Sequence, residues 1–360
     1  MPLPDPTHGR PRSLTREPAG GWPPERQTPG LALIMPVHGP LAAAAPALGA
    51  LEGLVPAPDE IIVVVDVPCS PADAALLPAG ARVVFVPHAC GPARARNAGA
   101  AAAVASTLFF VDADVVVPTD TVARVMDGFA RHPGVTALFG SYDARPGDPS
   151  FLSQYRNLMH HYVHQRSRES ARTFWSGLGA IRAEAFRAVG GFDEAYGMPC
   201  VEDIELGLRL ADAGGQIRLL KTLQACHLKR WTALDMLRTD LWQRGVPWMR
   251  LILARGEAPE DLNTDLASRW SVLLAGCGLL ALSAVPVAAA WAWPAVLALG
   301  GVVGLNLPFY RFLAGHRGVW FAVRSVPWHV VFFLECGLAA WLGLLLYGRD
   351  RWVGRWERRA

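Results

Sequence analysis

The feature that most constrains the fold is Ser271–Tyr310, a stretch of about forty residues without a single charge. A helix needs ~20 apolar residues to cross the hydrocarbon core of a bilayer, so this stretch is long enough for two spans. Trp291–Pro294 predicts a turn between them with aromatic anchors. A third apolar stretch, Val326–Tyr347, contains one acidic residue, Glu335. We therefore expect a transmembrane region at 269–348 with two or three spans.

The flanking charges indicate how this region is oriented. Arg311, Arg317 and Arg324 lie between the second and third apolar stretches, and an excess of basic residues is typical of cytoplasmic loops. The N-terminus has no apolar segment of the kind found in cleavable signal peptides. The six cysteines include no C-x-x-C pair, which favours reduced thiols. The sequence therefore predicts an integral protein of the cytoplasmic membrane with its soluble half in the cytosol.

The basic tail 349–360 does not fit three full crossings, because it would then lie outside the cell. Either one apolar segment is re-entrant or interfacial, or the local charge bias is overridden. Five arginines form the basic part of the tail: Arg349, Arg351, Arg355, Arg358 and Arg359. The formal net charge of +3 is too small to indicate a nucleic-acid partner.

The soluble half begins after a proline-rich segment, 1–29, whose composition predicts disorder. From Leu31 onward, short continuous apolar runs alternate with alanine-rich amphipathic stretches. Continuous runs are typical of strands buried on both faces of a parallel sheet, and the alternation predicts a doubly wound α/β domain. Expected strands are Leu31–Val37, Ile61–Val65, Arg82–Val86 and Thr107–Val111, and expected helices include Leu41–Leu54, Ala93–Ala105, Ser150–Ser170 and Glu202–Ala213.

Polar residues follow three of these strands: His38, Asp66, and the pair Asp112 and Asp114. Ligands of doubly wound sheets bind at the carboxyl ends of the strands. Two carboxylates separated by one residue can hold a divalent cation against a diphosphate, because Mg²⁺ is usually shared between one or two carboxylates and substrate phosphates. A helix N-cap followed by a solvated turn would give the same pattern, so the two carboxylates alone do not establish a metal site.

The order of the surrounding motifs is more specific. Between about Leu31 and Leu220 the chain resembles the family 2 glycosyltransferases. The resemblance implies a GT-A-type, mostly parallel α/β sheet at 30–228, a nucleotide-sugar donor, and a catalytic domain in the cytosol. The segments that carry it are Ile34–His38, Glu60–Asp66, Gly91–Gly99, Asp112–Asp114, Ser176–Gly179, Val189–Glu194 and Val201–Leu210.

The resemblance implies a donor site at the strand ends. Asp66 would contact the nucleobase, although the family's paired acidic residues are here reduced to one. Arg96 and Asn97 would support the diphosphate, although Arg94 and Arg96 could equally form a solvated face. The donor-binding residues implied are Pro36, His38, Asp66, Arg96, Asn97, Asp112 and Gly179.

The resemblance also implies the reacting groups. Asp203 would be the catalytic base, with Glu202 beside it. Acidic residues in the first turn of a helix can, however, serve only to stabilise the helix through its dipole. The metal ligands implied are Asp112, Asp114 and His227, and the metal is Mn²⁺ or Mg²⁺. One base and no nucleophile predict a single displacement with inversion at the sugar carbon.

Residues 229–268 are expected to form amphipathic interfacial helices. Over Trp231–Leu253, tryptophans at roughly helical spacing would lie at headgroup depth, with arginines facing lipid phosphates: Arg238, Arg244 and Arg250. The same pattern would fit a core-facing helix of a soluble domain. An interfacial helix next to the catalytic domain predicts a lipid-linked or membrane-presented acceptor, although membrane localisation alone would also explain the anchor.

Two other functions share parts of this pattern. A nucleotidyltransferase would need a basic, glycine-rich phosphate loop after the first strand, and His38–Leu41 contains no lysine or arginine. A non-catalytic membrane scaffold would not need the acidic residues, all of which are present. Gln243–Trp248 does not match the Q-x-x-R-W signature of processive synthases, which favours a single transfer.

Overall fold

The computed structural model describes residues 28–68, 71–257 and 266–352. The expectations for 1–27 and 353–360 lie outside these residues. The chain divides into two compact units. Of the described residues, the sheet unit contains those up to Asp148 and Arg168–Lys229. The helical unit contains Pro149–Ser167 and the residues from Arg230 onward. A segment from the middle of the chain thus belongs with the C-terminal helices.

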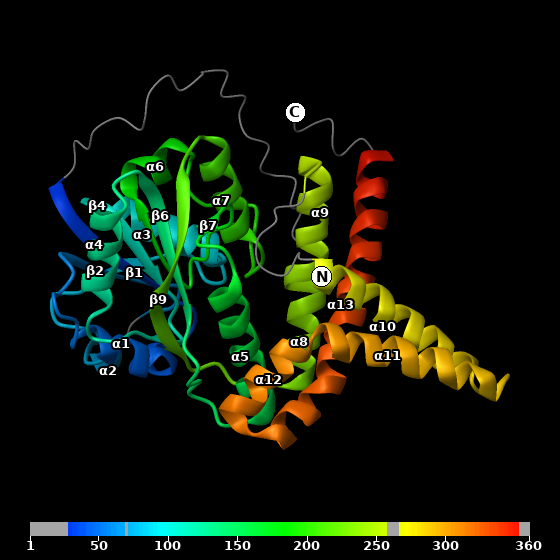
Figure 1. The fold of residues 1–360 in the computed structure, drawn as a ribbon. Helices are drawn as coiled ribbons and strands as arrows, with labels where there is room; N and C mark the ends of the chain where they lie inside the picture. The colour runs from blue at the N-terminus through cyan, green and yellow to red at the C-terminus, as the bar shows by residue number, and fades with distance from the viewer. Residues whose placement is uncertain (1–27, 69–70, 258–265, 353–360) are drawn as a thin grey trace. The chain divides into compact units, whose positions relative to one another are not determined.

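The first half of the sheet unit is a parallel sheet with the strand order β3-β2-β1-β4. Figure 1 labels β1, β2 and β4 of this sheet. These strands coincide with the four continuous apolar runs of the sequence, and the central residues of β1, β2 and β4 are fully buried. The chain winds outward from β1 in both directions, as in a doubly wound fold. The strands are β1 (Thr28–Val37), β2 (Glu60–Val65), β3 (Arg82–Phe85) and β4 (Ala105–Val111).

The second half of the sheet is mixed. Strand β8 (Leu178–Arg182) lies antiparallel between β4 and β6 (Val135–Tyr142), and β6 pairs in parallel with β9 (Gln216–His227). Two short strands, β5 (Val115–Val116) and β7 (Ser170–Ala171), pair antiparallel with β9. The expectation of a mostly parallel α/β sheet is confirmed.

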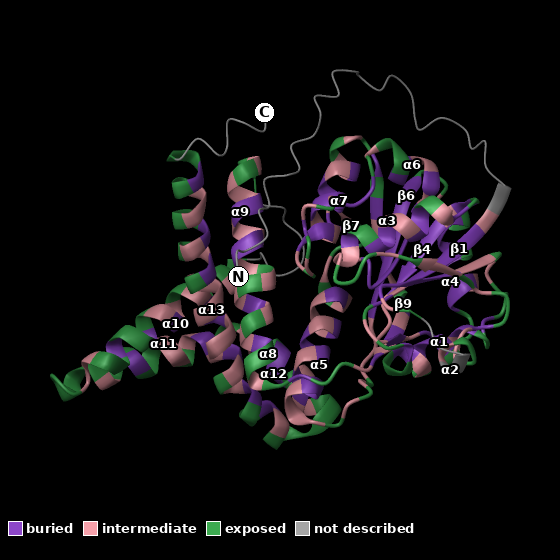
Figure 2. Ribbon diagram, turned by 180° about the vertical axis from the view of Figure 1, so that it is seen from behind, coloured by how far each residue is buried: buried purple, intermediate pink, exposed green. Residues whose placement is uncertain are grey.

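Helices cover both faces of this sheet. Side chains alternate along a strand, so Leu33 and Met35 of β1 face one way while Ala32 and Ile34 face the other. The first face packs against α1 (Ala45–Leu51) and α4 (Thr121–Arg131). The second packs against α3 (Pro92–Ala102), α6 (Ala183–Ala188) and α7 (Glu202–Asp212). Figure 2 shows the strands between them as largely buried. A short helix, η2 (Leu41–Ala44), precedes α1, and α2 (Pro71–Ala74) precedes β3.

The helical unit begins with α5 (Phe151–Arg166) and continues after residue 230. A π-helical turn, η3 (Thr239–Gly245), joins two of its helices. The other elements are α8 (Ala233–Arg238), α9 (Val246–Arg255), α10 (Leu266–Ala284), η4 (Ala289–Trp291), α11 (Ala292–Leu305), α12 (Leu307–Arg317) and α13 (Val319–Trp352).

Two of these helices, α10 and α13, are long and apolar enough to cross a membrane. The segment Ala289–Leu305 and α12 pass the same test only as a pair bent by 64°, which makes them a broken span or a re-entrant hairpin. The expected turn at Trp291–Pro294 is wrong. The chain breaks after Ala284, where Pro286 follows, while Pro294 lies in the first turn of α11, a position that tolerates proline.

The stretch Trp231–Leu253 also differs from its expected form. Trp231 is only 4% exposed and Arg250 only 6%. Arg250 donates a 2.6 Å hydrogen bond to Asp350 of α13. It therefore does not face lipid phosphates as expected, because a buried guanidinium takes the nearest carboxylate as its partner. Trp242 does remain exposed.

Candidate active site

Strands β1, β2 and β4 end at the same edge of the sheet, and β2 and β4 place acidic side chains there. Asp66 follows β2 and accepts hydrogen bonds from the amides of Gly39 (2.9 Å) and Ala89 (3.1 Å). His38 Nδ1 lies 2.5 Å from its carboxylate. Burial alone would raise the pKa of Asp66, but these hydrogen bonds and the charge of His38 outweigh it and lower the pKa. Asp66 is therefore a fixed anion at the mouth of the sheet.

A second histidine, His88, joins this group and was not foreseen from the sequence. Its Nδ1 lies 3.6 Å from Asp66, and its ring stacks on that of His38 with centroids 5.8 Å apart. Both rings are largely exposed. The sequence did contain a clue to His88: it follows the third strand closely, just as His38 follows the first. Pro36, half-buried within β1, pairs with Val64 of β2.

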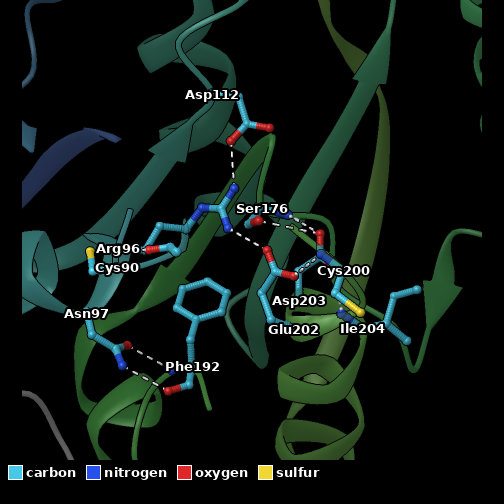
Figure 3. Close-up of polar contacts among 11 residues, drawn as sticks. Cys90, Arg96, Asn97, Asp112, Ser176, Phe192, Cys200, Glu202, Asp203 and Ile204 are labelled. Atoms are coloured by element: carbon cyan, nitrogen blue, oxygen red, sulfur yellow. Dashed lines mark hydrogen bonds and ion pairs between the residues drawn. The ribbon is translucent and has the colours of Figure 1, made fainter. Parts of the chain in front are cut away.

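The centre of the edge is held by a buried arginine, Arg96, which is 5% exposed. It donates one hydrogen bond to Asp112 (2.7 Å) and another to Glu202 (2.9 Å), as Figure 3 shows. Although burial alone would lower its pKa, the charges of Asp112 and Glu202 raise it above its ordinary value. Arg96 thus joins the loop Asp112–Asp114, called the D-A-D loop below, to the start of α7. It does not lie on a solvated face.

Asn97, the next residue, forms its hydrogen bonds within the protein. Its side chain donates to the carbonyl oxygen of Phe192 (2.8 Å) and accepts from the amide of Phe192 (2.9 Å), which Figure 3 also shows. It also donates to Glu194, and Arg94 forms an ion pair with the same carboxylate. Asn97 therefore fixes the loop after α6, and its predicted contact with the donor remains a prediction.

The two acidic residues of the D-A-D loop have different partners. Asp112 is paired with Arg96, whereas Asp114 Oδ2 lies 3.3 Å from Nε2 of His227. The pairing of β5 with β9 brings these two together, since Val115 is directly opposite His227. Burial alone would raise the pKa of Asp114, but His227 and Lys229 lower it. Asp114 and His227 thus form the second polar group of the edge.

Two aromatic residues border this pair and were not foreseen from the sequence. Tyr142, the last residue of β6, stacks on His227 with centroids 4.0 Å apart and the rings nearly parallel. Trp175 meets Tyr142 edge to face at 4.8 Å. A Cβ on Gly177 would lie within 3.0 Å of both the Trp175 ring and Asp112. Any larger residue at position 177 would therefore displace the Trp175 ring or the Asp112 carboxylate.

The donor set of Asp114 and His227 fits a divalent metal of the Mn²⁺ type, since carboxylate oxygen and imidazole nitrogen both suit such ions. Within the described parts of the chain, no group of three or more His, Cys, Asp or Glu side chains could hold a metal by itself. A site with two protein ligands is the kind that substrate phosphates complete. The geometry therefore fits a metal shared with a diphosphate better than a closed structural site.

Asp203, the predicted base, lies in the first turn of α7 and is partly buried. One carboxylate oxygen accepts from the amide of Ser176 at 3.2 Å, and the other from the amide of Ile204 at 2.8 Å (Figure 3). Burial and the neighbouring charge of Glu202 raise its pKa to about 7, against the opposing effect of Arg96. A carboxylate that titrates near neutral pH suits proton transfer.

The structure bears on the alternative that Glu202 and Asp203 only cap the helix. The N-cap of α7 is Val201, and it makes no side-chain capping hydrogen bond. Glu202 is 4% exposed and is held by Arg96 and by the amide of Cys200 (2.8 Å). Neither carboxylate occupies the capping position, although both lie where the helix dipole favours negative charge. Glu202 faces the buried arginine, and Asp203 contacts the loop before β8.

Gly179, predicted to contact the donor, lies buried within β8. A Cβ there would lie 2.4 Å from both the Phe174 ring and the carbonyl oxygen of Trp175. Packing inside the domain is therefore enough to require glycine at this position, and its contact with a donor remains a prediction.

Residues 33–190 match the family model for glycosyl transferase family 2, and residues 156–231 match that for the N-terminal domain of galactosyltransferase. The pre-mycofactocin glycosyltransferases of two Mycobacterium tuberculosis strains, CDC 1551 / Oshkosh and H37Rv, are 26% identical over 214 residues. The match covers 57% of this chain and 45% of those relatives, so the chain spans less than half of their length.

A solved structure of similar fold is the mannosyltransferase PcManGT from Pyrobaculum calidifontis in complex with GDP-Man and Mn²⁺. It aligns with a TM-score of 0.51 and 16% identity over 93% of this chain and 91% of that one. At this identity the likeness shows the fold alone. Residues 33–190 thus form a glycosyl transferase family 2 domain, on a sheet like that of GT-A neighbours, in a chain whose C-terminal apolar helices could span a membrane.

Proposed function

We propose that this enzyme transfers a sugar from a nucleoside-diphosphate sugar to an acceptor hydroxyl or phosphate presented at the cytoplasmic membrane, with inversion at the sugar carbon. The observation that supports it most is the chain of contacts Asp112–Arg96–Glu202, because it links the loop Asp112–Asp114 to the residue next to Asp203. One buried arginine thereby joins the loop proposed to bind the donor to the helix turn proposed to serve the acceptor. Pre-organisation of this kind reduces the cost of aligning the reactants.

The donor would occupy the edge between Asp66 and Asp114. The exposed rings of His38 and His88 offer stacking and hydrogen bonds to a nucleobase, with Asp66 as a fixed acceptor between them. Asp114 and His227 would hold a divalent metal, which would neutralise charge on the departing diphosphate. Mn²⁺ is bound with GDP-Man in the mannosyltransferase of similar fold, and this supports the same metal class here.

The acceptor would bind on the side of Asp203. An acceptor hydroxyl has a pKa far above 7, so a carboxylate within hydrogen-bond reach must take its proton as the oxygen attacks. With a pKa of about 7, Asp203 is about half ionised at neutral pH. Ser176 and Ile204 orient its two oxygens through their amides. Attack from the face opposite the leaving diphosphate inverts the anomeric configuration.

The test is donor hydrolysis by full-length protein in detergent against a panel of nucleotide-sugars, with Mn²⁺, with Mg²⁺ and with EDTA. We expect one donor class to be cleaved, chelator to abolish the cleavage, and Asp114→Asn to weaken metal-dependent donor binding. Full activity in chelator would exclude the metal, and the absence of cleavage of every donor would exclude the donor class. Transfer to membrane lipid extract, compared with soluble sugars, then tests the acceptor.

A further inference from the structure

A pocket in the helical unit has no role in the site above. Its volume is about 560 Å³, within the range of small-molecule sites. Three segments that are distant in sequence form its walls: the start of α5, the residues leading into α8, and the early turns of α13. The lining residues are Ser150, Phe151, Leu152, Arg230, Trp231, Thr232, Arg324, Pro327 and Trp328.

The charge of this lining has one sign. Arg230 and Arg324 are both exposed, and the part of the chain that the structure describes contributes no carboxylate to the lining. Within the described residues, neither arginine forms an ion pair. Elsewhere in the same unit, Arg156 and Arg250 are paired with Asp240 and Asp350. The pocket therefore concentrates positive charge that its own walls do not neutralise.

Arg324 is held in a position suited to an anion. Its guanidinium lies over the ring of Phe151, 4.4 Å from the centroid. Stacking uses the face of the guanidinium, so its in-plane N–H groups remain directed outward. Such a planar set of donors matches the oxygens of a phosphate. In addition, α5 begins in the pocket wall, and the amides at a helix start carry the positive end of the helix dipole.

The apolar part of the lining indicates what bears the phosphate. Pro327 and Trp328 lie at the beginning of the apolar run of α13, the longer of the two helices that could cross a membrane. Arginine and tryptophan are typical of the depth at which lipid headgroups lie. A soluble anion would gain nothing from Trp231, Trp328 and Phe151, whereas the first methylene groups of a lipid would bury against them.

We propose that this pocket binds the phosphate group of a lipid, with Arg230 and Arg324 as its ligands and the acyl or prenyl chain along α13. The binding itself is independent of catalysis. Only the further step, that this lipid is the sugar acceptor, rests on the proposed function.

The test compares lipid adducts by native mass spectrometry of full-length protein in detergent. The probes are phosphatidic acid, diacylglycerol of the same chains, and inorganic phosphate. The pocket variant is Arg230→Gln/Arg324→Gln. The matched control is Arg238→Gln/Arg311→Gln, which removes the same charge from two exposed positions of the helical unit that do not line the pocket. Because all four arginines are exposed, we expect every variant to fold, with circular dichroism as the check.

We expect wild type and control to bind phosphatidic acid well above diacylglycerol, and the pocket variant to bind it about a hundredfold more weakly, or about tenfold per charge-assisted contact. Equal losses in both double variants would mean non-specific attraction and overturn the proposal. Competition by inorganic phosphate at the lipid's own concentration would overturn the lipid assignment. If the lipid binds as expected but receives no sugar, the pocket stands and the proposed acceptor is wrong.

Discussion

At the scale of single residues, two of three neighbouring carboxylates bond to one arginine, Arg96. Asp112 and Glu202 neutralise Arg96, and Asp203 is left without a cationic hydrogen-bond partner among the contacts described. Burial and the charge of Glu202 then keep its proton on up to about pH 7. Two adjacent acidic residues thus have different partners, because only Glu202 bonds to the arginine.

The first prediction concerns the protonation of Asp203. The base must be ionised to accept a proton, so kcat/KM should rise with pH and level off above about pH 7. Asp203→Asn should lower turnover by ~10²–10⁴-fold, since that is the usual contribution of a general base. The measurement is a pH–rate profile of both proteins with a fixed donor. Wild-type turnover in the variant would assign the base elsewhere.

The same substitution should change stability with a definite sign. The folded-state pKa of Asp203 lies above the ordinary value of 3.8, so the native state binds this proton more tightly than the unfolded chain does. Raising the pH from about 4 to about 7 therefore lowers the free energy of unfolding of the wild type. The variant does not lose this contribution, because asparagine is neutral throughout. The melting temperature of Asp203→Asn relative to wild type should increase over that interval and then stay constant. A constant difference across the interval would contradict the raised pKa.

Glu202 should act as a positioning residue. Glu202→Gln keeps an oxygen that can accept from Arg96 or from the Cys200 amide, but it removes the charge that raises the pKa of Asp203. The acidic limb of the pH–rate profile should therefore move to lower pH, with turnover at pH 8 reduced far less than in Asp203→Asn. A loss at pH 8 as large as that of Asp203→Asn would instead make Glu202 a catalytic residue.

At the scale of elements, α7 owes its position to a glycine. A Cβ on Gly207 would lie 2.3 Å from the backbone nitrogen of Phe174 and 2.7 Å from the carbonyl carbon of Thr173. The helix that carries Glu202 and Asp203 is thus pressed directly onto the backbone that leads to Ser176. That close approach allows the Ser176 amide to reach Asp203.

Gly207→Ala should therefore destabilise the protein, although alanine is the better helix former. Overpacking against backbone costs about 1–3 kcal/mol, which exceeds the gain of about 1 kcal/mol from helix propensity. Gly49→Ala in α1 is the matched control, because a Cβ at Gly49 would have nothing within 4 Å and only the propensity gain remains. Thermal melts should move in opposite directions for the two variants. A higher melting temperature for Gly207→Ala would show that α7 can move away.

At the scale of the whole molecule, the helical unit is not a simple C-terminal appendage. Helix α5 lies between β6 and β7 in the sequence, yet it packs with the later helices. Its Arg156 pairs with Asp240, its Tyr162 ring contacts Phe309, and Ser153 accepts from the amide of Trp231. The two units are therefore interleaved along the chain, and neither can be removed by a single cut.

Truncation after Leu228 should accordingly fail to give a well-behaved soluble domain. The cut removes every partner of α5 named above and exposes side chains that are fully buried in the intact protein, among them Tyr155 and Leu158. We expect aggregation on size-exclusion chromatography. The control replaces 149–167 by a short Gly/Ser linker in the same truncated chain, which should restore a monomer. A monomeric, cooperatively melting protein from the simple truncation would show that the sheet unit tolerates an unpartnered α5.

Much of this protein could be predicted from local sequence pattern. The four continuous apolar runs coincide with β1–β4, and the long apolar segments coincide with the helices that could span a membrane. The acidic residues at the strand ends lie at one edge of the sheet. The mixed half of the sheet was harder to predict. Strands β6, β8 and β9 take their directions from pairing with distant strands, and local hydropathy does not indicate strand direction.

The sequence by itself thus determined the fold class and the apolar segments, because each depends on residues within a short window, and the family resemblance, because it depends on the order of short motifs along the chain. The tertiary structure alone decided which charges meet. Arg96 reaches Glu202, 106 residues away, and Arg250 reaches Asp350, 100 residues away. A buried charge must find a partner, but any of many carboxylates could satisfy that need. The packing of α3 and α7 on the same face of the sheet, and of α9 on α13, selects among them. This selection leaves Asp203 without a hydrogen bond to Arg96, as the proposed role of a base requires.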